Sequence, residues 1–530
     1  MDPSSPPTTR RQLLHAIGLV GGTAALYNAM TAMGHAAETQ FHGPPQLSGG
    51  KGQSVIVLGS GLAGMLAAYE LSKAGYKVRI LEYQNRPGGR NWSLYGGDTY
   101  TELGGAVQHV QFQPGNYLNP GPWRIPHHHR TLLHYCKAFG VALEPFIQFN
   151  HNAFVHSSKA FGGKPKHYRE VAADFEGSIA ELLGKAMNKK ALDDEVKPED
   201  RERLMTALRG WGMLDENMQY KSNLRSASHR GYDRPPGGGV NGAPIPSAID
   251  TTFSDLLDPI VWTNMAFFMG HEMQTTMFQP VGGMGMIGKG FAKQVGQYIT
   301  FNAKVTKILQ DQKGVTVTYA DTGSGAVQTA QADYCVCTIP LGVLNQIESN
   351  LSPKMKAAVS AVPYSNSVKI GLEMRRRFWE EDDALYGGHS FTNQDISLIS
   401  YPNYNFFTDK PAVILGAFAS NMGGYRLAAM TPEERIEAAL TQGAVFHPEA
   451  YRKEFMNGAS VAWPRVPWTL GCCARWTEET RAEHYQTLVA MDNRVVLAGE
   501  HASYIGCWME GALLSSIDAI TRLHQRAVAA

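Results

Sequence analysis

The chain has 530 residues, of which 43% are hydrophobic and 18% are charged, and its formal net charge is +1 at pH 7. This composition is typical of a globular protein of two or three domains and excludes a disordered, fibrous or membrane-embedded chain. Because the sequence has neither a surplus of positive charge nor a nucleic-acid-binding motif, we expect no nucleic-acid partner and no membrane association.

The first residues predict an export signal. Thr9-Arg10-Arg11 leads into a weakly apolar stretch rich in glycine and alanine, which small residues follow near Ala36. This pattern resembles a twin-arginine signal, which carries proteins that have already folded around a cofactor. The alternative is an N-terminal helix that remains and packs on the body of the protein. We expect a periplasmic or secreted protein if the leader is used, and a cytoplasmic one otherwise.

The folded part is predicted to open with a βαβ unit. Residues 54–58 form a continuous apolar run rich in β-branched side chains, which is typical of a buried parallel strand. The glycine-rich segment 59–64 follows, residues 65–74 have helical spacing, and residues 77–81 predict a second strand. This order of elements indicates the dinucleotide-binding half of a doubly wound α/β domain.

The three glycines of the turn have separate tasks. Gly59 makes the tight turn, Gly61 lets the backbone approach a pyrophosphate, and Gly64 lets the helix pack on the strand. Glu82, at the end of the second strand, is placed to accept hydrogen bonds from ribose hydroxyls. The unit therefore predicts a bound dinucleotide, but it does not distinguish NAD from FAD.

Further segments resemble motifs of the flavin amine oxidase family and extend over the whole folded chain. They are residues 86–90, 103–106, 280–284, 302–319, 332–340, 495–501 and 508–512. Because such separated segments have to converge on one long ligand, the resemblance implies FAD as the cofactor. The residues that it adds to the cofactor site are Gly89, Arg90, Gly104, Gly105, Ala106, Val305, Trp468, Gly499, Glu500, Gly511 and Ala512.

The chemistry of these residues suits the parts of FAD. Arg90 offers a fork of donors to a phosphate, and Glu500 can accept hydrogen bonds from ribityl hydroxyls. A helix that begins near Gly511 and Ala512 would turn its positive end toward the flavin ring. Cys472 stands where monoamine oxidases tether FAD through a thioether, whereas L-amino acid oxidases generally bind FAD without a covalent bond. We expect non-covalent FAD and keep the thioether as the alternative.

The predicted fold class is α/β, with an FAD-binding doubly wound, glutathione-reductase-like domain, a discontinuous α+β substrate domain and a helical insertion. The FAD-binding domain is assigned to residues 51–115, 280–350 and 485–530. The substrate-binding domain is assigned to residues 116–165, 256–279 and 351–484. The leader and linker occupy residues 1–50, and the helical insertion occupies residues 166–255. The resemblance also implies a homodimer, which is the common form of the family.

Residues 121–126 indicate the branch of the family. Gly121-Pro122-Trp123-Arg124-Ile125-Pro126 is very similar to a segment of L-amino acid oxidases in which the arginine binds the α-carboxylate of the substrate. A planar guanidinium matches a carboxylate with two parallel hydrogen bonds, whereas an amine substrate has no group that needs it. Residues 400–406 resemble the segment that gives the carboxylate a second donor, and we assign this role to Tyr401, with the register open by one residue.

Three further residues are assigned to the flavin face. Lys369, on an apolar strand, matches the lysine that holds a water against the flavin in relatives, where it would assist the reaction with oxygen or the hydrolysis of the imine. Trp508 would form a wall for the substrate amine, and Cys507 would contribute its backbone carbonyl. The family has glycine at the position of Cys507, so we expect the backbone there to be less free.

These assignments predict oxidative deamination of L-amino acids, with hydride transfer from Cα to flavin N5. The products would be a 2-oxo acid, ammonia and, after reoxidation by dioxygen, hydrogen peroxide. Two alternatives remain open at this point. One is a flavin amino acid 2-monooxygenase that gives an amide by oxidative decarboxylation, and the other is an amine oxidase without carboxylate recognition.

Metal binding is not predicted. His127-His128-His129 lie side by side, but no carboxylate or cysteine is spaced to complete a ligand set, so we interpret them as the solvated start of a helix. The six cysteines fit neither a zinc site nor a disulfide scaffold, and most are expected to be buried thiols. Cys335 and Cys337, two apart on a predicted strand, should point to the same face.

Overall fold

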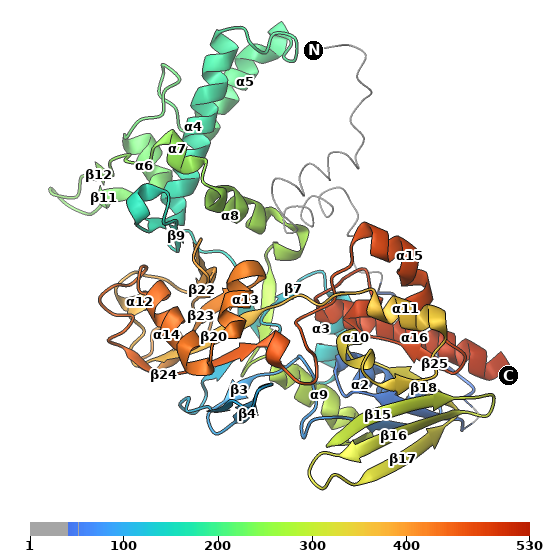
Figure 1. Ribbon diagram of the computed structural model, residues 1–530. Helices are drawn as coiled ribbons and strands as arrows, with labels where there is room; N and C mark the ends of the chain where they lie inside the picture. The colour runs from blue at the N-terminus through green and yellow to red at the C-terminus, as the bar shows by residue number, and fades with distance from the viewer. Residues whose placement is uncertain (1–40, 51, 530) are drawn as a thin grey trace.

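The computed structural model describes residues 41–50 and 52–529 (Figure 1). The predicted leader lies almost entirely outside these residues. No helix in the described part of the chain is long and apolar enough to cross a membrane.

The first lobe is built on a parallel sheet of five strands in the order β14-β2-β1-β18-β25. The strands are β1 (Ser54–Leu58), β2 (Lys77–Leu81), β14 (Ile299–Thr300), β18 (Tyr334–Cys337) and β25 (Val495–Leu497). The apolar run of β1 lies at the centre, where both faces of a parallel sheet are covered. Helix α2 (Leu62–Lys73) connects β1 to β2, so the predicted βαβ unit is present.

The two faces of this sheet are covered differently. Val55, Val57 and Val336 pack against α2 and against α3 (Arg130–Ala138), α9 (Gly285–Val295) and α16 (Met509–Ala529). Cys335 and Cys337 face the other side together, as their spacing predicted. That side is covered by an antiparallel sheet and helix α11 (Pro353–Ser360). The antiparallel strands are β15 (Ala303–Gln310), β16 (Val315–Asp321) and β17 (Val327–Ala332), with the short β19 (Glu348–Ser349) at the edge.

A second lobe contains a mixed sheet of seven strands in the order β10-β9-β21-β22-β23-β20-β24. Every residue of its strand β20 is buried, because the strand lies between β23 and β24 and beneath helices α13 (Asn421–Ala429) and α14 (Pro432–Gly443). The strands are β9 (Phe154–His156), β10 (Lys166–His167), β20 (Val368–Met374), β21 (His389–Thr392), β22 (Leu398–Ser400), β23 (Ala412–Ala419) and β24 (Phe455–Ala462).

Between the two lobes lies a small sheet in the order β7-β13-β8, which Figure 1 shows near the centre of the molecule. Its strands are β7 (Ile125–Pro126), β8 (Leu143–Phe146) and β13 (Met277–Pro280). Phe278 pairs with Ile125 and Met277 with Pro126, so β13 lies beside the segment that directly follows Arg124. This small sheet positions the candidate substrate site.

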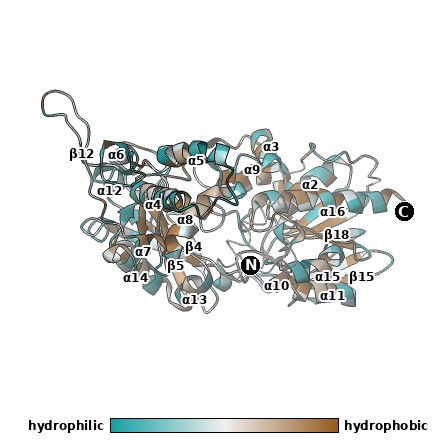
Figure 2. Cartoon of the chain, turned by 90° about the horizontal axis from the view of Figure 1, so that it is seen from above, coloured by the Kyte–Doolittle hydropathy of each residue, from teal (hydrophilic) through white to brown (hydrophobic). Residues whose placement is uncertain are grey.

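The range 166–255 is mostly helical and projects from the second lobe (Figure 1). It contains α4 (Tyr168–Asn188), α5 (Pro198–Trp211), α6 (Leu224–Arg230) and α7 (Phe253–Leu256), and α8 (Pro259–Met269) leads back to the centre. A buried ion pair joins α4 to α6, since Nε of Arg230 lies 2.8 Å from Oδ1 of Asp174. Figure 2 shows hydrophilic residues concentrated on outer helices such as α5 and hydrophobic ones on interior strands.

Candidate functional site

The glycine-rich turn after β1 leaves space for a ligand. A Cβ atom on Gly64 would lie 2.0 Å from the carbonyl oxygen of Gly59, so the helix packs on the turn as closely as the sequence predicted. A Cβ atom on Gly61 would meet nothing within 4 Å. Gly89 packs against Gly61, which brings two of the predicted cofactor segments into contact. The open side at Gly61 fits the close approach of a pyrophosphate.

Glu82 is fixed beside this turn. Its Oε2 accepts hydrogen bonds from the backbone N–H of Ser60 at 2.6 Å and from the Ser60 hydroxyl at 2.8 Å. Its Oε1 accepts from the backbone N–H of Gln84 at 2.8 Å. The carboxylate is therefore oriented at the end of β2, where a ribose would lie.

Arg90 and Glu500 form an ion pair that the sequence did not predict. Nη1 of Arg90 lies 2.7 Å from Oε1 of Glu500 and also donates to the backbone carbonyl of Cys472 at 2.8 Å. Burial alone would raise the pKa of Glu500, but Arg90, His501 and the hydrogen bonds from Arg90 and from the backbone N–H of Cys507 together outweigh burial and hold the pKa below its usual range. Two residues assigned to different parts of FAD thus lie next to each other and neutralise each other.

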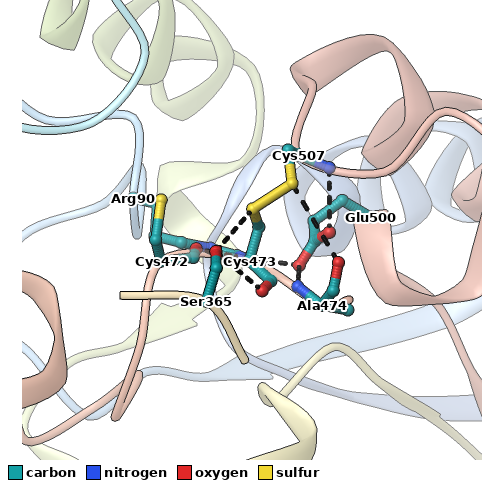
Figure 3. Close-up of a disulfide and its surroundings, with 7 residues drawn as sticks. All are labelled: Arg90, Ser365, Cys472, Cys473, Ala474, Glu500 and Cys507. Carbon is teal, nitrogen blue, oxygen red and sulfur yellow. Dashed lines mark hydrogen bonds and ion pairs between the residues drawn. A yellow bond between two sulfur atoms is a disulfide. The ribbon is translucent and has the colours of Figure 1, made fainter. Parts of the chain in front are cut away.

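Cys473 and Cys507 form a disulfide, shown in Figure 3 beside Glu500. The expectation of buried thiols holds for Cys136, Cys335 and Cys337, but it is wrong for this pair. The two cysteines are 34 residues apart, and only the packing of the segment before α15 (Glu478–Val489) against the loop before α16 brings them together.

The backbone at Cys507 has a φ of 67°, in the left-handed region that favours glycine. Cys507 therefore adopts a conformation that glycine reaches more easily than cysteine. The backbone N–H of Cys507 donates to Oε2 of Glu500 at 3.1 Å, so the same carboxylate contacts Arg90 and the loop that carries Trp508.

The segment with Gly104, Gly105 and Ala106 lies between the short strands β4 (Thr99–Thr101) and β5 (Val107–His109). Both glycines are exposed, and a Cβ atom on Gly105 would meet nothing within 4 Å. The neighbouring Glu102 is buried in an ion pair with Arg435, whose Nη1 lies 2.8 Å from Oε2. This pair anchors the segment to α14 and leaves its glycine backbone open to a ligand.

The remaining predicted cofactor residues occupy the same lobe or its border. Val305 is buried on β15, Gly499 lies two residues after the end of β25, and Gly511 and Ala512 belong to the first turn of α16. The indole N–H of Trp468 is buried and has no hydrogen-bond partner among the described residues. An open glycine turn, a helix N-terminus and an orphaned indole donor fit a bound dinucleotide.

Arg124 immediately precedes β7, and only 4% of its surface is exposed. Its Nε and Nη1 atoms have no hydrogen-bond partner, and no carboxylate among the described residues pairs with it. Burial lowers the pKa of Arg124 to about 9, because the charged form is separated from water. A buried cation without a counterion is costly, and the described residues supply no anion to balance this one.

The surroundings of Arg124 form a box that is mostly aromatic. Its guanidinium carbon lies 5.0 Å from the ring centre of Trp123, 5.6 Å from that of Phe267 and 5.9 Å from that of Trp508. Nη2 lies 3.0 Å from the sulfur of Met273. The structure thus brings Arg124 and Trp508 together as predicted. Phe267 and Met273 belong to an apolar segment, residues 265–278, for which the sequence leaves both core and the wall of an apolar pocket open.

Lys369 lies on strand β20 and is 2% exposed. Its Nζ donates to the backbone carbonyl of Gly121 and lies 4.6 Å from the ring centres of Trp123 and Phe418. Burial lowers the pKa of Lys369 to about 7; the nearby Cys472 thiol opposes this shift, and the Arg124 charge adds to it. At neutral pH this amine can therefore hold or release a proton.

The structure does not bring Tyr401 to Arg124. The Tyr401 hydroxyl bonds with Oγ of Ser390 at 2.8 Å and Nε2 of His447 at 2.9 Å, within the separate core of the second lobe. The prediction that the Tyr401 hydroxyl lies beside Arg124 as a second carboxylate donor is therefore wrong. Side chains alternate along an extended segment, so the preceding Ser400 faces the other way.

Ser400 is connected to the Arg124 box through one histidine. Its hydroxyl bonds with Nδ1 of His389 at 2.9 Å, and the ring of His389 stacks on Trp123 with ring centres 5.0 Å apart. Ser400 therefore contacts His389 and not Arg124 itself.

The histidine triplet is not a solvated helix start. His127 is exposed, but His128 and His129 are buried, and Nε2 of each lies within 3.1 Å of the same carboxylate oxygen of Glu272. Burial raises the pKa of Glu272, but the two imidazoles outweigh it and lower the pKa to about 2. The expectation failed because Glu272 is more than 140 residues away in the sequence and no spacing rule links the two segments.

The comparison with protein families decides the identity. The profile of the family described as flavin containing amine oxidoreductase matches residues 62–523. The chain belongs to this family. The resemblance drawn from the sequence is therefore confirmed, and a flavin is the cofactor that the family implies.

Within the flavin-containing amine oxidoreductases, several relatives cover most of the chain. A putative L-amino-acid oxidase of Bacillus subtilis, YobN, is 26% identical over 488 residues, which cover 87% of this chain and 93% of that protein. An L-amino-acid oxidase of Siganus canaliculatus is 26% identical over 484 residues, covering 89% and 85%. One from Vipera ammodytes ammodytes is 27% identical over 481 residues, covering 88% and 91%.

Solved structures of the family share the fold. Cyclohexylamine oxidase from Brevibacterium oxydans superposes with a TM-score of 0.58 at 20% identity, covering 89% of this chain and 99% of that one. A double mutant of putrescine oxidase gives a TM-score of 0.57 at 17% identity, covering 90% and 99%. The predicted fold class is therefore confirmed.

Proposed function

We propose that this flavoenzyme oxidises the α-amino group of L-amino acids, as the names of its relatives suggest. The observation that carries the proposal is Arg124, a buried guanidinium with two unpartnered donors and no counterion among the described residues. An α-carboxylate supplies both the charge and the paired acceptors that this group lacks. A simple amine would leave Arg124 as it is, buried and unpaired.

The aromatic box positions the rest of the substrate. Trp123, Phe267 and Trp508 surround the guanidinium, so a carboxylate held there is separated from water and its interaction with Arg124 is strengthened. We propose that Trp508 forms the wall beside the amino group and that the backbone carbonyl of Cys507 contacts the substrate. These contacts fix the orientation of the Cα–H bond, which supplies much of the rate in such reactions.

We propose that the flavin is FAD, held between Gly61, Glu82 and the N-terminus of α16. When bound, it supplies the acceptor for the two electrons and the hydrogen that leave the amino acid. We expect FAD to be bound non-covalently, because burial raises the pKa of the Cys472 thiol and disfavours the thiolate that a thioether linkage would start from.

Lys369 is proposed to handle a proton at the same site. Its pKa of about 7 and its contact with the carbonyl of Gly121 place an amine that can exchange a proton at neutral pH next to Trp123. We propose that Lys369 orients a water molecule for the reaction with dioxygen or for the hydrolysis of the imine. Export through a twin-arginine signal and assembly as a homodimer are proposed as well.

The decisive assay uses the purified yellow protein with the twenty L-amino acids. Hydrogen peroxide, ammonia and 2-oxo acid are measured, and amide is measured in parallel. We expect the first three products in equal amounts. Amide with carbon dioxide would identify the monooxygenase alternative, and turnover of amines but of no amino acid would contradict the proposal.

A further inference from the structure

A second candidate site lies behind the Arg124 box. His128 and His129, just before α3, meet Glu272 on the short helix η3 (His271–Met273). Nε2 of His128 lies 3.1 Å from Oε2 of Glu272, and Nε2 of His129 lies 2.8 Å from the same atom. The three residues are 6%, 0% and 4% exposed. We call them the HHE cluster.

The three side chains present the donor set of a transition-metal site. Two imidazole nitrogens and one carboxylate oxygen converge from two separate segments, and all three atoms lie within 4.8 Å of one another. Imidazole and carboxylate are ligands that Zn²⁺ and its neighbours in the first transition series accept. Two further histidine rings are close, since the ring centre of His271 lies 4.4 Å and that of His127 5.2 Å from that of His128.

The spacing of the three atoms is close to that of a metal site. With metal–ligand bonds of about 2.0–2.1 Å, ligand atoms in a tetrahedral site lie roughly 3.3–3.4 Å apart. The two observed nitrogen–oxygen distances of 2.8 and 3.1 Å would widen by a few tenths of an ångström. The two Nε2 atoms, which lie within 4.8 Å of each other, would adjust to the same spacing.

We propose that the HHE cluster binds one divalent transition-metal ion, with Zn²⁺ as the best match, through Nε2 of both histidines and a carboxylate oxygen of Glu272. A water molecule or His271 would complete a tetrahedral set. The ion replaces the hydrogen bonds between the imidazoles and the carboxylate, because each Nε2 atom has to be unprotonated to bind a metal; a neutral imidazole then carries its proton on Nδ1.

The position of the cluster gives the ion a structural role. The ring of His129 meets that of Trp508 edge-on with ring centres 5.0 Å apart, and Glu272 directly precedes Met273, whose sulfur contacts Arg124. An ion at the cluster would tie the segment of Arg124 to the segment of Met273 from behind. It would stiffen the wall of the substrate site without touching the reacting atoms. This inference does not depend on which amine the enzyme oxidises.

The test uses the flavin-loaded full chain, purified without a polyhistidine tag and treated with a chelator. Zn²⁺ binding is measured by competition with a chromophoric chelator, and Co²⁺ alone is added to read the d–d absorption of a tetrahedral site against the flavin spectrum. We expect one ion per chain, a tetrahedral Co²⁺ spectrum and a higher unfolding temperature with Zn²⁺.

Matched variants locate the ion. Glu272→Gln preserves the size of the side chain, and we expect it to weaken Zn²⁺ binding at least tenfold and to remove the Co²⁺ band, as should His129→Ala. The flavin content and unfolding temperature without metal show whether each variant is folded. His127→Ala removes the exposed neighbour and should leave binding unchanged.

Three results would overturn the proposal. The wild-type protein could bind no ion, binding could persist undiminished in folded Glu272→Gln, or binding could be lost in His127→Ala. The second and third results would assign the ion to cysteines or to a surface histidine, and the first would identify the HHE cluster as a purely hydrogen-bonded structure.

Discussion

Replacing Arg124 with methionine separates its proposed role from a structural one. Methionine keeps the unbranched shape and fills the aromatic box without a charge. Breaking a buried ion pair by removing one partner costs about 3–5 kcal/mol. Since about 1.4 kcal/mol corresponds to a factor of ten in rate, kcat/KM for L-amino acids should fall by roughly 150- to 5,000-fold.

The same change should have the opposite effect on the free protein. Arg124 has no counterion among the described residues, and burial works against its charge, so Arg124→Met should unfold at the same or a higher temperature than the wild type.

The assay compares the best L-amino acid with the amine that carries the same side chain, because only the amino acid uses Arg124. Arg203→Met, at a site whose side chain is 83% exposed, serves as the control. An equal loss of kcat/KM with both substrates, or a lower unfolding temperature, would refute the reasoning, because either result would mean that Arg124 supports the fold.

Three further outcomes are expected. Lys369 is neutral in the folded protein above pH 7 but stays charged in the unfolded chain up to its ordinary pKa of 10.5. The free energy of unfolding of the wild type relative to Lys369→Met should therefore rise with pH across this window, by at most about 1.4 kcal/mol per pH unit. A difference in urea unfolding that does not change with pH would contradict the burial effect. Reducing the Cys473–Cys507 disulfide, which spans 34 residues, should lower the free energy of unfolding by about 4 kcal/mol, because the unfolded chain gains entropy. The number of titratable thiols per chain should rise from four to six. An unchanged unfolding midpoint would count against a formed disulfide. Glu102→Gln should lower the free energy of unfolding in urea by about 3–5 kcal/mol, because it leaves the fully buried Arg435 without its carboxylate partner. A loss below about 1 kcal/mol would show that water reaches the ion pair.

Local patterns in the sequence were enough to predict the nucleotide-binding lobe. The apolar run of β1, the turn at Gly59 and the acid at the end of β2 are neighbours in the chain, so their geometry follows from short-range rules. The position of Cys335 and Cys337 on the same face of the sheet follows from the same kind of short-range rule.

Features that depend on distant contacts could not be predicted in this way. The role of Tyr401 was predicted wrongly because side chains alternate along an extended segment, so a shift of one residue in the alignment places a side chain on the opposite face. The partner of His129 is Glu272, and the partner of Cys473 is Cys507; in both cases the segments meet only through tertiary packing. Arg124 was identified by its motif, but its lack of a counterion is visible only in the folded structure.

The most direct test of the central claim is to mix the purified protein with substrate in the absence of oxygen and to follow the visible absorption of the flavin. We expect an L-amino acid to bleach this absorption, whereas its D-enantiomer leaves it unchanged and the amine with the same side chain bleaches it far more slowly. A colourless protein, or bleaching by the amine but not by the amino acid, would contradict the account.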